Sequence, residues 1–316
     1  MEYPVVSVVI PTHNRKEKLL RLIKSILESD YLKEKLEIIV VDDASTDGTH
    51  EYMNKLFPQV KIIRNEEEKL LAESRNIGIR ASKGKYILLI DDDNLVDKNA
   101  IRVLVEFMEA HPEVGVAGPI MYFLADPRRI WCAGVKRNYW TTLTKFLGFN
   151  TIDYSQFKKP YDSEDFPNAF MVRRDIFKKV GLFNSKLFPI HYDEADFCQR
   201  VKKLGYRVMV VPMARVWHDI PLPEQTRTSI FHLKNSLRAY YAIRNRILFH
   251  AKWSKNTVQR FISLLASLII AVYYIVMILE SNITNKYDVI RSVIKGIIDG
   301  LRMLKVITIN RIVLGR

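Results

Sequence analysis

Cysteine is nearly absent from this sequence: the 316 residues include only Cys132 and Cys198, far apart in the chain and in no metal-ligand spacing. A disulfide scaffold or a structural zinc site needs more cysteines at closer intervals. The first residues, Met1-Glu-Tyr-Pro4, lack the basic and apolar segments of a secretory signal, so we expect no signal peptide. These two absences favour a protein of a reducing compartment.

Internal repeats and low-complexity segments are also absent, and the composition is not that of a disordered chain. With 48% hydrophobic and 27% charged residues, the chain can bury a large core. One large domain with an appendage is the simplest organisation at this length.

Acidic residues are scarce towards the C-terminus, where residues 226–316 contain fifteen lysines and arginines but only three acids. This segment carries +12 of the net charge of +14, so the first 225 residues are nearly neutral. A basic segment on a neutral body suggests an anionic partner, either a membrane or a nucleic acid.

Apolar strands and amphipathic helices alternate along the first 118 residues. Runs of apolar or β-branched residues predict strands, and apolar residues three or four apart predict helices. Strands that alternate with helices of this length form crossovers in a mostly parallel sheet, which predicts an α/β fold. The predicted strands are 5–11, 36–42, 60–63, 86–90 and 114–118, and the predicted helices are 19–27, 70–81 and 98–110.

The alternation stops after Pro119. Residues 120–168 are irregular and rich in aromatic residues, which predicts hairpins and loops over the edge of the sheet. Their aromatic side chains either line one wall of a substrate site or pack a second small core. Later in the chain we predict strands at 169–172 and 206–211, a short helix at 174–180 and a helix that starts near 192.

Three consecutive carboxylates follow the predicted strand 86–90. Asp91, Asp92 and Asp93 stand at its carboxyl end, where open α/β sheets bind their ligands. Adjacent carboxylates repel one another, so the cluster favours a divalent cation bound together with substrate phosphates. The simpler interpretation is a solvated acidic turn that caps the next helix.

Asp42, Asp43 and Arg75 are further candidate binding residues. Asp42 and Asp43 follow the second strand, where a carboxylate can accept hydrogen bonds from a base or a ribose. They could instead cap a turn, with Ser45 or Asp47 capping the next helix. Arg75 could neutralise a diphosphate or be an exposed helix charge.

Asp193, Glu194 and His218 are candidates for catalysis and metal binding. Asp193 or Glu194 could act as a general base, or the pair could simply stabilise a helix N-terminus. His218 could supply a nitrogen ligand to a metal, although a lone histidine after a tryptophan is more often structural.

The order and spacing of these residues closely resemble the family 2 glycosyltransferases, nucleotide-sugar enzymes with the Rossmann-like GT-A fold. The resemblance covers roughly residues 5 to 250 and rests on seven motifs in family order. The motifs are Val8-Val-Ile-Pro-Thr-His-Asn-Arg15, Val41-Asp-Asp-Ala-Ser-Thr-Asp-Gly-Thr49, the segment Ala72 to Gly78, Leu89-Ile-Asp-Asp-Asp93, Gly181-Leu-Phe183, Asp193-Glu-Ala-Asp196 and Trp217-His218.

The resemblance implies roles for individual residues. Arg75 would approach the donor near its ribose or diphosphate, and Glu194 falls at the position of the family's catalytic base. Many members have Glu-Asp there, whereas this chain has Asp-Glu, so the base is either Glu194 or Asp193. The implied nucleotide-sugar site contains Pro11, Thr12, Asn14, Asp42, Asp43, Arg75, Asp91 and Asp92, and the implied metal ligands are Asp91, Asp93 and His218.

The implied chemistry is an inverting, hexosyltransferase-like reaction that depends on Mg²⁺ or Mn²⁺. The cation would stabilise the charge that develops on the departing diphosphate, and one carboxylate would deprotonate the acceptor hydroxyl. Processive members of the family carry Gln-x-x-Arg-Trp after the base. No such segment lies between Trp217 and Trp253, so we expect transfer of a single sugar.

Residues 261–279 contain no charged residue. At about 1.5 Å per residue, this segment matches a hydrocarbon core about 30 Å thick. Basic residues flank both ends, so the positive-inside rule gives no clean orientation. An embedded hairpin or in-plane helix, a true span, and a buried core or oligomer helix all stay open. From residue 289 the pattern is that of a basic amphipathic helix, which suits an anionic membrane interface.

We therefore predict a GT-A catalytic domain at 1–225 and a helical membrane-associating region at 226–316. The enzyme would work at the cytoplasmic face of the membrane on a lipid-linked glycan or polysaccharide precursor. Nucleic acid is disfavoured as a partner because the basic charge is interleaved with an apolar run. The rivals are a nucleotidyltransferase, which would usually show a glycine-rich triphosphate loop, and a silent nucleotide-sugar-binding membrane scaffold. The oligomeric state stays open.

Overall fold

The computed structural model describes residues 3–223 and 235–314, with side chains up to residue 304. The chain divides into two compact units. The sheet unit comprises residues 1–136, 146–185 and 194–222, and the helical unit comprises residues 137–145, 186–193 and 223–316. The two short segments of the helical unit interrupt the sheet unit in sequence.

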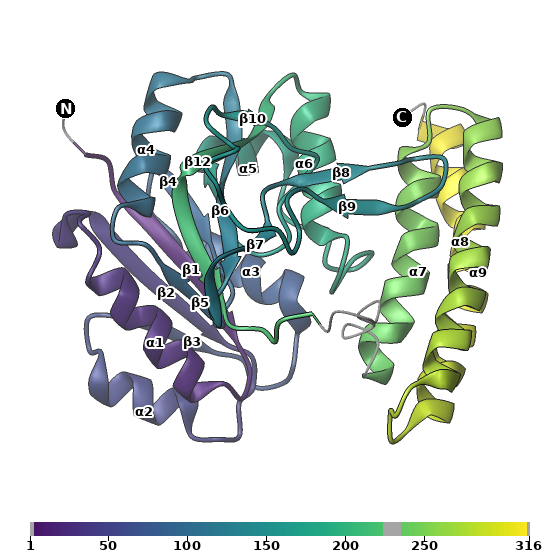
Figure 1. Cartoon of the computed structure of the whole chain (residues 1–316), viewed down its shortest axis with the longest axis horizontal. Helices are drawn as coiled ribbons and strands as arrows, with labels where there is room; N and C mark the ends of the chain where they lie inside the picture. Colours follow the sequence, from purple (N-terminus) through teal and green to yellow (C-terminus); the bar gives the residue numbers. More distant parts are fainter. Residues whose placement is uncertain (1–2, 224–234, 315–316) are drawn as a thin grey trace. The chain divides into compact units, whose positions relative to one another are not determined.

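The sheet unit is built on a sheet with the strand order β10-β12-β6-β11-β4-β1-β2-β3, with β5 beside β12 and β7 beside β6 (Figure 1). Its first half is parallel: β1 pairs in parallel with β2 and β4, and β2 pairs in parallel with β3. Antiparallel β11 lies between β4 and β6 and makes the sheet mixed. The bounds are β1 Val6–Thr12, β2 Leu36–Asp42, β3 Lys61–Arg64, β4 Tyr86–Leu89, β5 Asn94–Val96, β6 Val114–Phe123, β7 Asp126–Cys132, β10 Tyr161–Asp162, β11 Phe170–Arg173 and β12 Arg207–His218.

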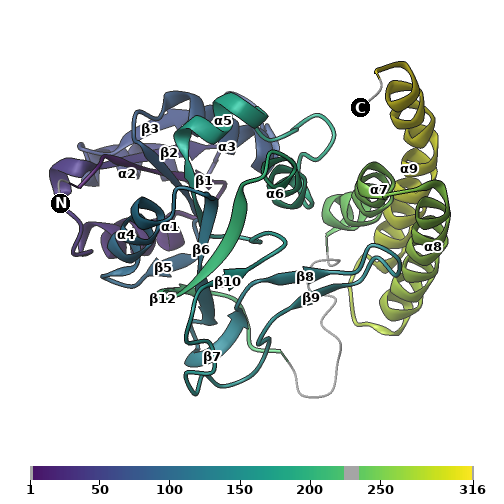
Figure 2. The same cartoon turned by 90° about the horizontal axis from the view of Figure 1, so that it is seen from above.

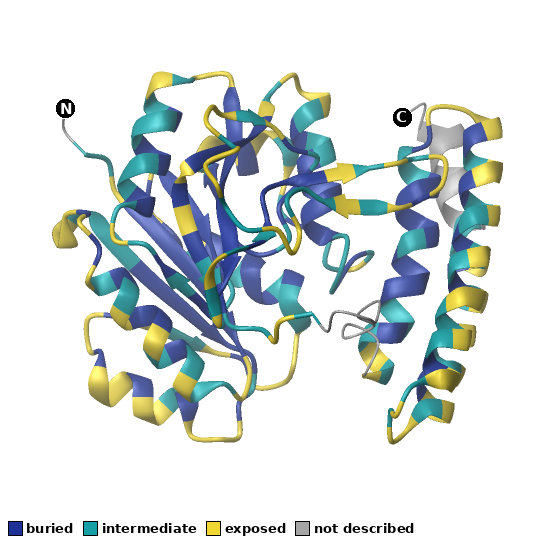
Figure 3. Ribbon diagram, viewed as in Figure 1, coloured by how far each residue is buried: buried dark blue, intermediate teal, exposed yellow. Residues whose placement is uncertain are grey.

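Helices cover both faces of this sheet, which is why its central strands are buried throughout (Figure 3). Side chains alternate between the two faces of a strand. Val8 and Ile10 of β1 thus pack in the core under α1, α2 and α4, whereas Val9 packs in the core under α3, α5 and α6. The bounds are α1 Lys16–Leu27, α2 Thr49–Leu56, α3 Leu70–Ala81, α4 Ala100–Ala110, α5 Arg174–Val180 and α6 Asp193–Lys203, with a 3-10 turn η1 at Lys33–Lys35.

The predicted α/β order is confirmed along the first half of the chain, and the helix predicted at 70–81 matches α3. The prediction that residues 120–123 are irregular is wrong, because these residues extend β6 to Phe123. Pro119 lies where the pairing with β12 shifts register, between Gly118 and Ile120. A proline at such an irregularity costs no ladder hydrogen bond, so it does not end the strand.

The helical unit contains α7 Ser236–Trp253, α8 Thr257–Glu280 and α9 Lys286–Leu314. Asn235 and Asn256 cap α7 and α8 by accepting backbone hydrogen bonds in the first turn. Gly296 lets α9 approach α7 closely, because a Cβ atom there would lie 2.6 Å from the carbonyl oxygen of Tyr240. The hairpin strands β8 Val135–Arg137 and β9 Thr144–Phe146 flank the segment 137–145.

Candidate functional site

The carboxyl ends of β1, β2 and β4 bring the predicted donor-site residues to one edge of the sheet. Thr12 at the end of β1 pairs in register with Asp42 at the end of β2. Val9 pairs with Leu89 on the other side, so Asp91–Asp93 emerge beside the end of β1. Parallel strands place their carboxyl ends together, which explains why sequence motifs far apart meet here.

Asp92 lies under the end of β1 and is almost completely buried. The Thr12 hydroxyl donates to its Oδ2 at 2.7 Å, and Arg15 donates to its Oδ1 at 3.0 Å. Burial raises the pKa of Asp92 to about 6, although Arg15 and Thr12 act in the opposite direction. The structure thus brings together Thr12 and Asp92, two of the predicted donor-site residues, and they form a hydrogen bond with each other.

Arg75 joins two groups that are 103 positions apart in the chain. Its side chain, on α3, is fully buried, and it donates to Asp91 Oδ1 at 2.7 Å and to Glu194 Oε1 at 2.6 Å. Burial raises the pKa of Asp91, and Arg75 opposes that shift. A single guanidinium therefore holds the strand-end carboxylate beside the first turn of α6.

Asp93 and His218 form a second pair. His218 ends β12 and stands opposite Asn94 of β5, which places its Nε2 3.3 Å from Asp93 Oδ1. Trp131 packs edge-on against the imidazole, with ring centroids 4.4 Å apart. Burial alone would raise the pKa of Asp93. Hydrogen bonding to His218 and the charges of His218 and Arg15 outweigh burial and lower this pKa to about 2. His218 Nδ1 is buried and has no hydrogen-bond partner among residues 3–223 and 235–304.

Asp42 and Asp43 differ in how their oxygens are used. Asp43 accepts hydrogen bonds from the backbone of Lys69 and Leu70, and from the side chain of Asn65, so it fixes the start of the helix that carries Arg75. Asp42 Oδ1 accepts from the Ser45 backbone at 3.0 Å. Its Oδ2 is buried and lacks a partner within the described part of the chain. Asp42 therefore keeps one carboxylate oxygen without a partner in the described residues, whereas both oxygens of Asp43 accept hydrogen bonds.

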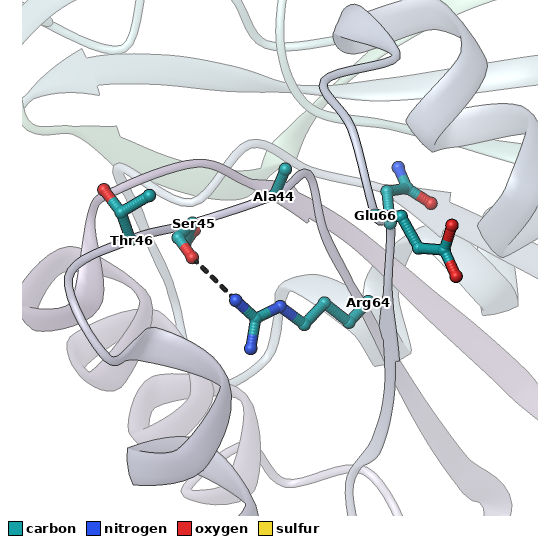
Figure 4. Close-up of a pocket in the computed structure, with 6 residues that line it drawn as sticks. Ala44, Ser45, Thr46, Arg64 and Glu66 are labelled. Carbon is teal, nitrogen blue, oxygen red and sulfur yellow. Dashed lines mark hydrogen bonds between the residues drawn. The ribbon is translucent and has the colours of Figure 1, made fainter.

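A cavity of about 340 Å³ opens beside the loop that follows Asp42 (Figure 4). Arg64 at the end of β3 reaches across it and donates to the Ser45 carbonyl at 3.2 Å. Asn14 holds the loop from the β1 side, because its Oδ1 accepts from the Thr46 backbone and its own backbone donates to Ser45 Oγ. The lining residues are Ala44, Ser45, Thr46, Arg64, Asn65 and Glu66.

Several residues at this site escaped the sequence-based selection. Arg15 contacts both Asp92 and Asp93, and only its place in the motif 8–15 hinted at a role. Asn65 had no signal in the sequence, and Trp131 was one of the aromatic residues of 120–168 that could line a substrate site. Pro11 lies buried in β1, and Asp193 at the first position of α6 is fully buried, whereas Glu194 is 8% exposed.

The family profile described as glycosyl transferase family 2 matches residues 7–181, which is more than half of the chain. The chain belongs to glycosyltransferase family 2. A relative is Probable glycosyltransferase YdaM of Bacillus subtilis (strain 168), 28% identical over 233 residues. The match covers 70% of this chain and 52% of YdaM, so the chain spans about half the length of that relative.

Solved structures confirm the GT-A fold. GalNAc-T7 with UDP, GalNAc and Mn²⁺ superposes with a TM-score of 0.60 at 21% identity, covering 84% of this chain and 54% of that one. The mannosyltransferase PcManGT from Pyrobaculum calidifontis, in complex with GDP-Man and Mn²⁺, superposes with a TM-score of 0.59 at 16% identity, covering 95% and 88%.

Proposed function

We propose that this protein is a metal-dependent, inverting glycosyltransferase that moves one sugar from a nucleotide-diphosphate donor to a hydroxyl acceptor. The observation that carries the proposal is the bridge from Asp91 through Arg75 to Glu194. Through this bridge the Glu194 carboxylate, the proposed base, would stand beside the strand-end acids of the proposed donor site.

The nucleotide would be recognised at the end of β2. Asp42 Oδ2 is a buried acceptor without a partner in the described residues, and the neighbouring cavity is lined by loop backbone and by Arg64. An unpaired buried carboxylate oxygen is costly, so an N–H or O–H donor on a base or ribose would be well matched to it.

Asp93 and His218 fit a divalent cation. Asp93 would supply a carboxylate oxygen and His218 an imidazole nitrogen, and these two atoms lie 3.3 Å apart. Among the described residues, no group of three or more acidic, histidine or cysteine side chains is arranged around a metal. The remaining ligands would therefore come from the donor diphosphate and water, which is usual for Mg²⁺. When bound, the cation would neutralise the charge on the departing diphosphate.

The chain's own groups would complete the reaction. Glu194 would take the proton of the acceptor hydroxyl while its oxygen attacks the anomeric carbon from the side opposite the diphosphate. The carbon–oxygen bond to the β-phosphate breaks, and the nucleoside diphosphate leaves with the electron pair. One displacement inverts the anomeric centre. Arg75 would orient the Glu194 carboxylate through their 2.6 Å contact, so that it faces the acceptor hydroxyl.

The acceptor would be a lipid-linked glycan precursor at the cytoplasmic face of a membrane. Within the described residues, α8 is the one helix long and apolar enough to cross a bilayer, and it belongs to the strongly basic C-terminal segment. An enzyme held at the lipid surface meets a lipid-linked acceptor at high local concentration.

The test is a nucleotide-release assay with UDP-, GDP- and TDP-sugars, with Mn²⁺ or Mg²⁺, and with or without membrane lipid extract. We expect release of one diphosphate, stimulated by lipid, abolished by chelator and lost in Asp93→Ala and Glu194→Gln. NMR of the product should show β-linkage from an α-linked donor. Metal-dependent nucleotide binding without release from any donor would instead establish a silent nucleotide-sugar binder.

A further inference from the structure

Helix α8 has its apolar side facing outward. Only 22% of its most apolar 18-residue window is buried in the protein, although a core helix of this hydropathy would be mostly buried. The large exposed side chains recur every three or four residues and form one stripe along the helix. The stripe contains Val258, Phe261, Ile262, Leu265, Ile269, Val272, Tyr273, Val276 and Leu279.

The opposite side of α8 is small and polar. Gln259, Ser263, Ser267 and Ala271 recur at intervals of four and are buried. Their polar groups are satisfied locally: Ser267 Oγ donates to the Ser263 carbonyl at 2.8 Å, and Gln259 Oε1 accepts from the Lys255 backbone at 2.6 Å. Small residues facing neighbouring helices and large apolar residues facing outward are the pattern of helices packed in lipid.

α8 shares its inner core with both neighbouring helices, which lie side by side with it in two views (Figures 1 and 2). Ala271 and Ile278 pack in one cluster with Ile243 and Ile247 of α7 and with Val293 of α9. A perpendicular α8 would therefore take α9 into the hydrocarbon as well. α9 carries Arg291 and Arg302, whose side chains are 83% and 78% exposed, and such charges are costly there.

We propose that the stripe of α8 is a membrane-docking surface that lies in the plane of one leaflet of an anionic bilayer rather than across it. The charge of the segment decides between lipid and a second copy of the chain. Residues 226–316 carry +12, so two copies would repel each other, whereas anionic headgroups would attract them. Lys255 is exposed two residues before α8, and Lys286 begins α9 and donates to the Leu279 carbonyl near the other end of α8 at 3.4 Å. Long lysine side chains at these places can reach headgroups. This proposal rests on the proposed function and specifies that the protein binds its membrane through a single leaflet.

Depth measurements distinguish the arrangements. Both native cysteines are buried, so Phe261→Cys, Ile269→Cys and Val276→Cys can each carry one environment-sensitive fluorophore. With phosphatidylcholine vesicles containing phosphatidylglycerol, we expect all three labels to be quenched equally by lipids spin-labelled near the headgroup. A deep label at 269 between two shallow ones would establish a span and overturn the proposal.

Vesicle flotation tests the partner. Binding should be strong with phosphatidylglycerol and weak with phosphatidylcholine alone, and Lys255→Ser or Lys286→Ser should each weaken it roughly fivefold. A protein that stays off anionic vesicles and sediments as a dimer with shielded labels would show that a second copy covers the stripe. Flotation needs no sugar donor, so this result is independent of the proposed transfer reaction.

A separate observation concerns Arg244 and Asn245 of α7. Both lie in the helical unit and are buried, and Arg244 Nε donates to Asn245 Oδ1 at 2.9 Å. Asn245 Nδ2 donates to the carbonyls of Ile190 and His191 at 2.8 and 3.0 Å. Arg244 also donates to the carbonyl of Leu187. Two neighbouring side chains thus hold three carbonyls of the segment 186–193.

This held segment is strained and leads directly into the proposed base. His191 and Tyr192 have positive φ angles of 62° and 64°, which non-glycine residues seldom adopt. Such conformations persist only where surrounding contacts enforce them. We infer that Asn245 and Arg244 are positioning residues that hold this bend, which ends at Asp193, the residue before Glu194 in the chain. The inference rests on the proposed function of Glu194.

The test compares Asn245→Asp, which keeps the shape and removes the donors, with Leu237→Ala at an exposed site on the same helix. We expect Asn245→Asp to lower kcat on the order of 10²-fold without changing the affinity for the nucleoside diphosphate. Leu237→Ala should change neither. Equal losses of kcat and nucleotide affinity, or full activity in Asn245→Asp, would show that the contacts are only structural. A wild type that binds nucleotide but transfers no sugar would refute the proposed function and this inference together.

Discussion

Helices α1 and α8 are both amphipathic, but α1 turns its apolar side towards the protein core, whereas α8 turns its apolar side outward. α1 buries Leu19, Leu22, Ile23 and Ile26 against the sheet and exposes Glu17, Arg21 and Lys24. α8 buries Gln259, two serines, Ala271 and, near its end, Ile278, and it exposes most of its other large apolar residues. Hydrophobic burial drives apolar side chains away from water. The outer face of α8 thus presents large apolar side chains where that of α1 presents charged ones.

The largest effect we predict separates sugar transfer from membrane binding. Glu194→Gln should lower kcat by about 10²–10⁴-fold, since a general base contributes this much, and should leave vesicle binding unchanged. Asp193→Asn should cost less, because the Asp193 carboxylate is fully buried. Single-turnover sugar transfer and vesicle flotation on the same preparations measure both properties. A larger loss of kcat in Asp193→Asn would move the base to Asp193.

A matched pair of substitutions tests the opposed helices directly. Leu22 in α1 is fully buried, whereas Ile269 in α8 is 69% exposed. Leu22→Ser should lower the free energy of unfolding by about 2–5 kcal/mol, because it leaves a cavity and buries a hydroxyl. Ile269→Ser should change it by less than about 0.5 kcal/mol. Urea unfolding measures the difference.

Vesicle binding should rank the same pair in reverse. Ile269→Ser should weaken flotation with anionic vesicles several-fold, while folded Leu22→Ser should float like the wild type. If Ile269→Ser destabilised the protein as much as Leu22→Ser, the stripe of α8 would be a buried core face and the comparison would fail.

Local sequence patterns could predict only those parts of the site that lie at the ends of strands. Crossovers between parallel strands bring Asp42 and Asp91–Asp93 to one edge, so their meeting followed from the predicted parallel sheet. The Arg75–Glu194 contact could not be derived in this way, because it joins residues 119 positions apart through tertiary packing. The pairing of Asp43 with the start of α3 was likewise hidden, since an acid after a strand serves a cap and a ligand site equally well.

The same distinction holds in the C-terminal segment. The uncharged run 261–279 was visible in the sequence, and it lies within α8. Which side of the helix faces inward depends on α7 and α9, and their packing is not encoded in any local period. The boundary at 225/226 is simpler than the observed units, because residues 137–145 and 186–193 also pack with the helical unit.

Asp92 provides a pH-dependent prediction within the sheet unit. Its pKa is raised to about 6 by burial, so its contribution to stability is fully present below its ordinary pKa and is lost as the pH rises through 6. Without divalent cations, Asp92→Asn should gain stability relative to the wild type between pH 4 and pH 7, by about 3 kcal/mol at most. Thermal unfolding of both proteins across that range measures the gain. A constant difference between them would show that Asp92 is ionised throughout.

The smallest effect should come from Asp42, and its two consequences should differ in sign. Asp42→Asn keeps an oxygen to accept from the Ser45 backbone and removes the charge from a buried atom without a partner in the described residues. Relief of that buried charge should leave the ligand-free protein as stable as the wild type or more so. Loss of the acceptor should raise the dissociation constant of the nucleoside diphosphate about tenfold, the value of one hydrogen bond to a charged group. Calorimetry with the diphosphate and unfolding without it measure the two quantities, and Lys24→Ala on the exposed side of α1 is the control. A variant that binds nucleotide normally but unfolds more easily would make Asp42 a turn-forming residue. The sheet unit would then retain its base and its acidic cluster but lose its proposed means of recognising the donor.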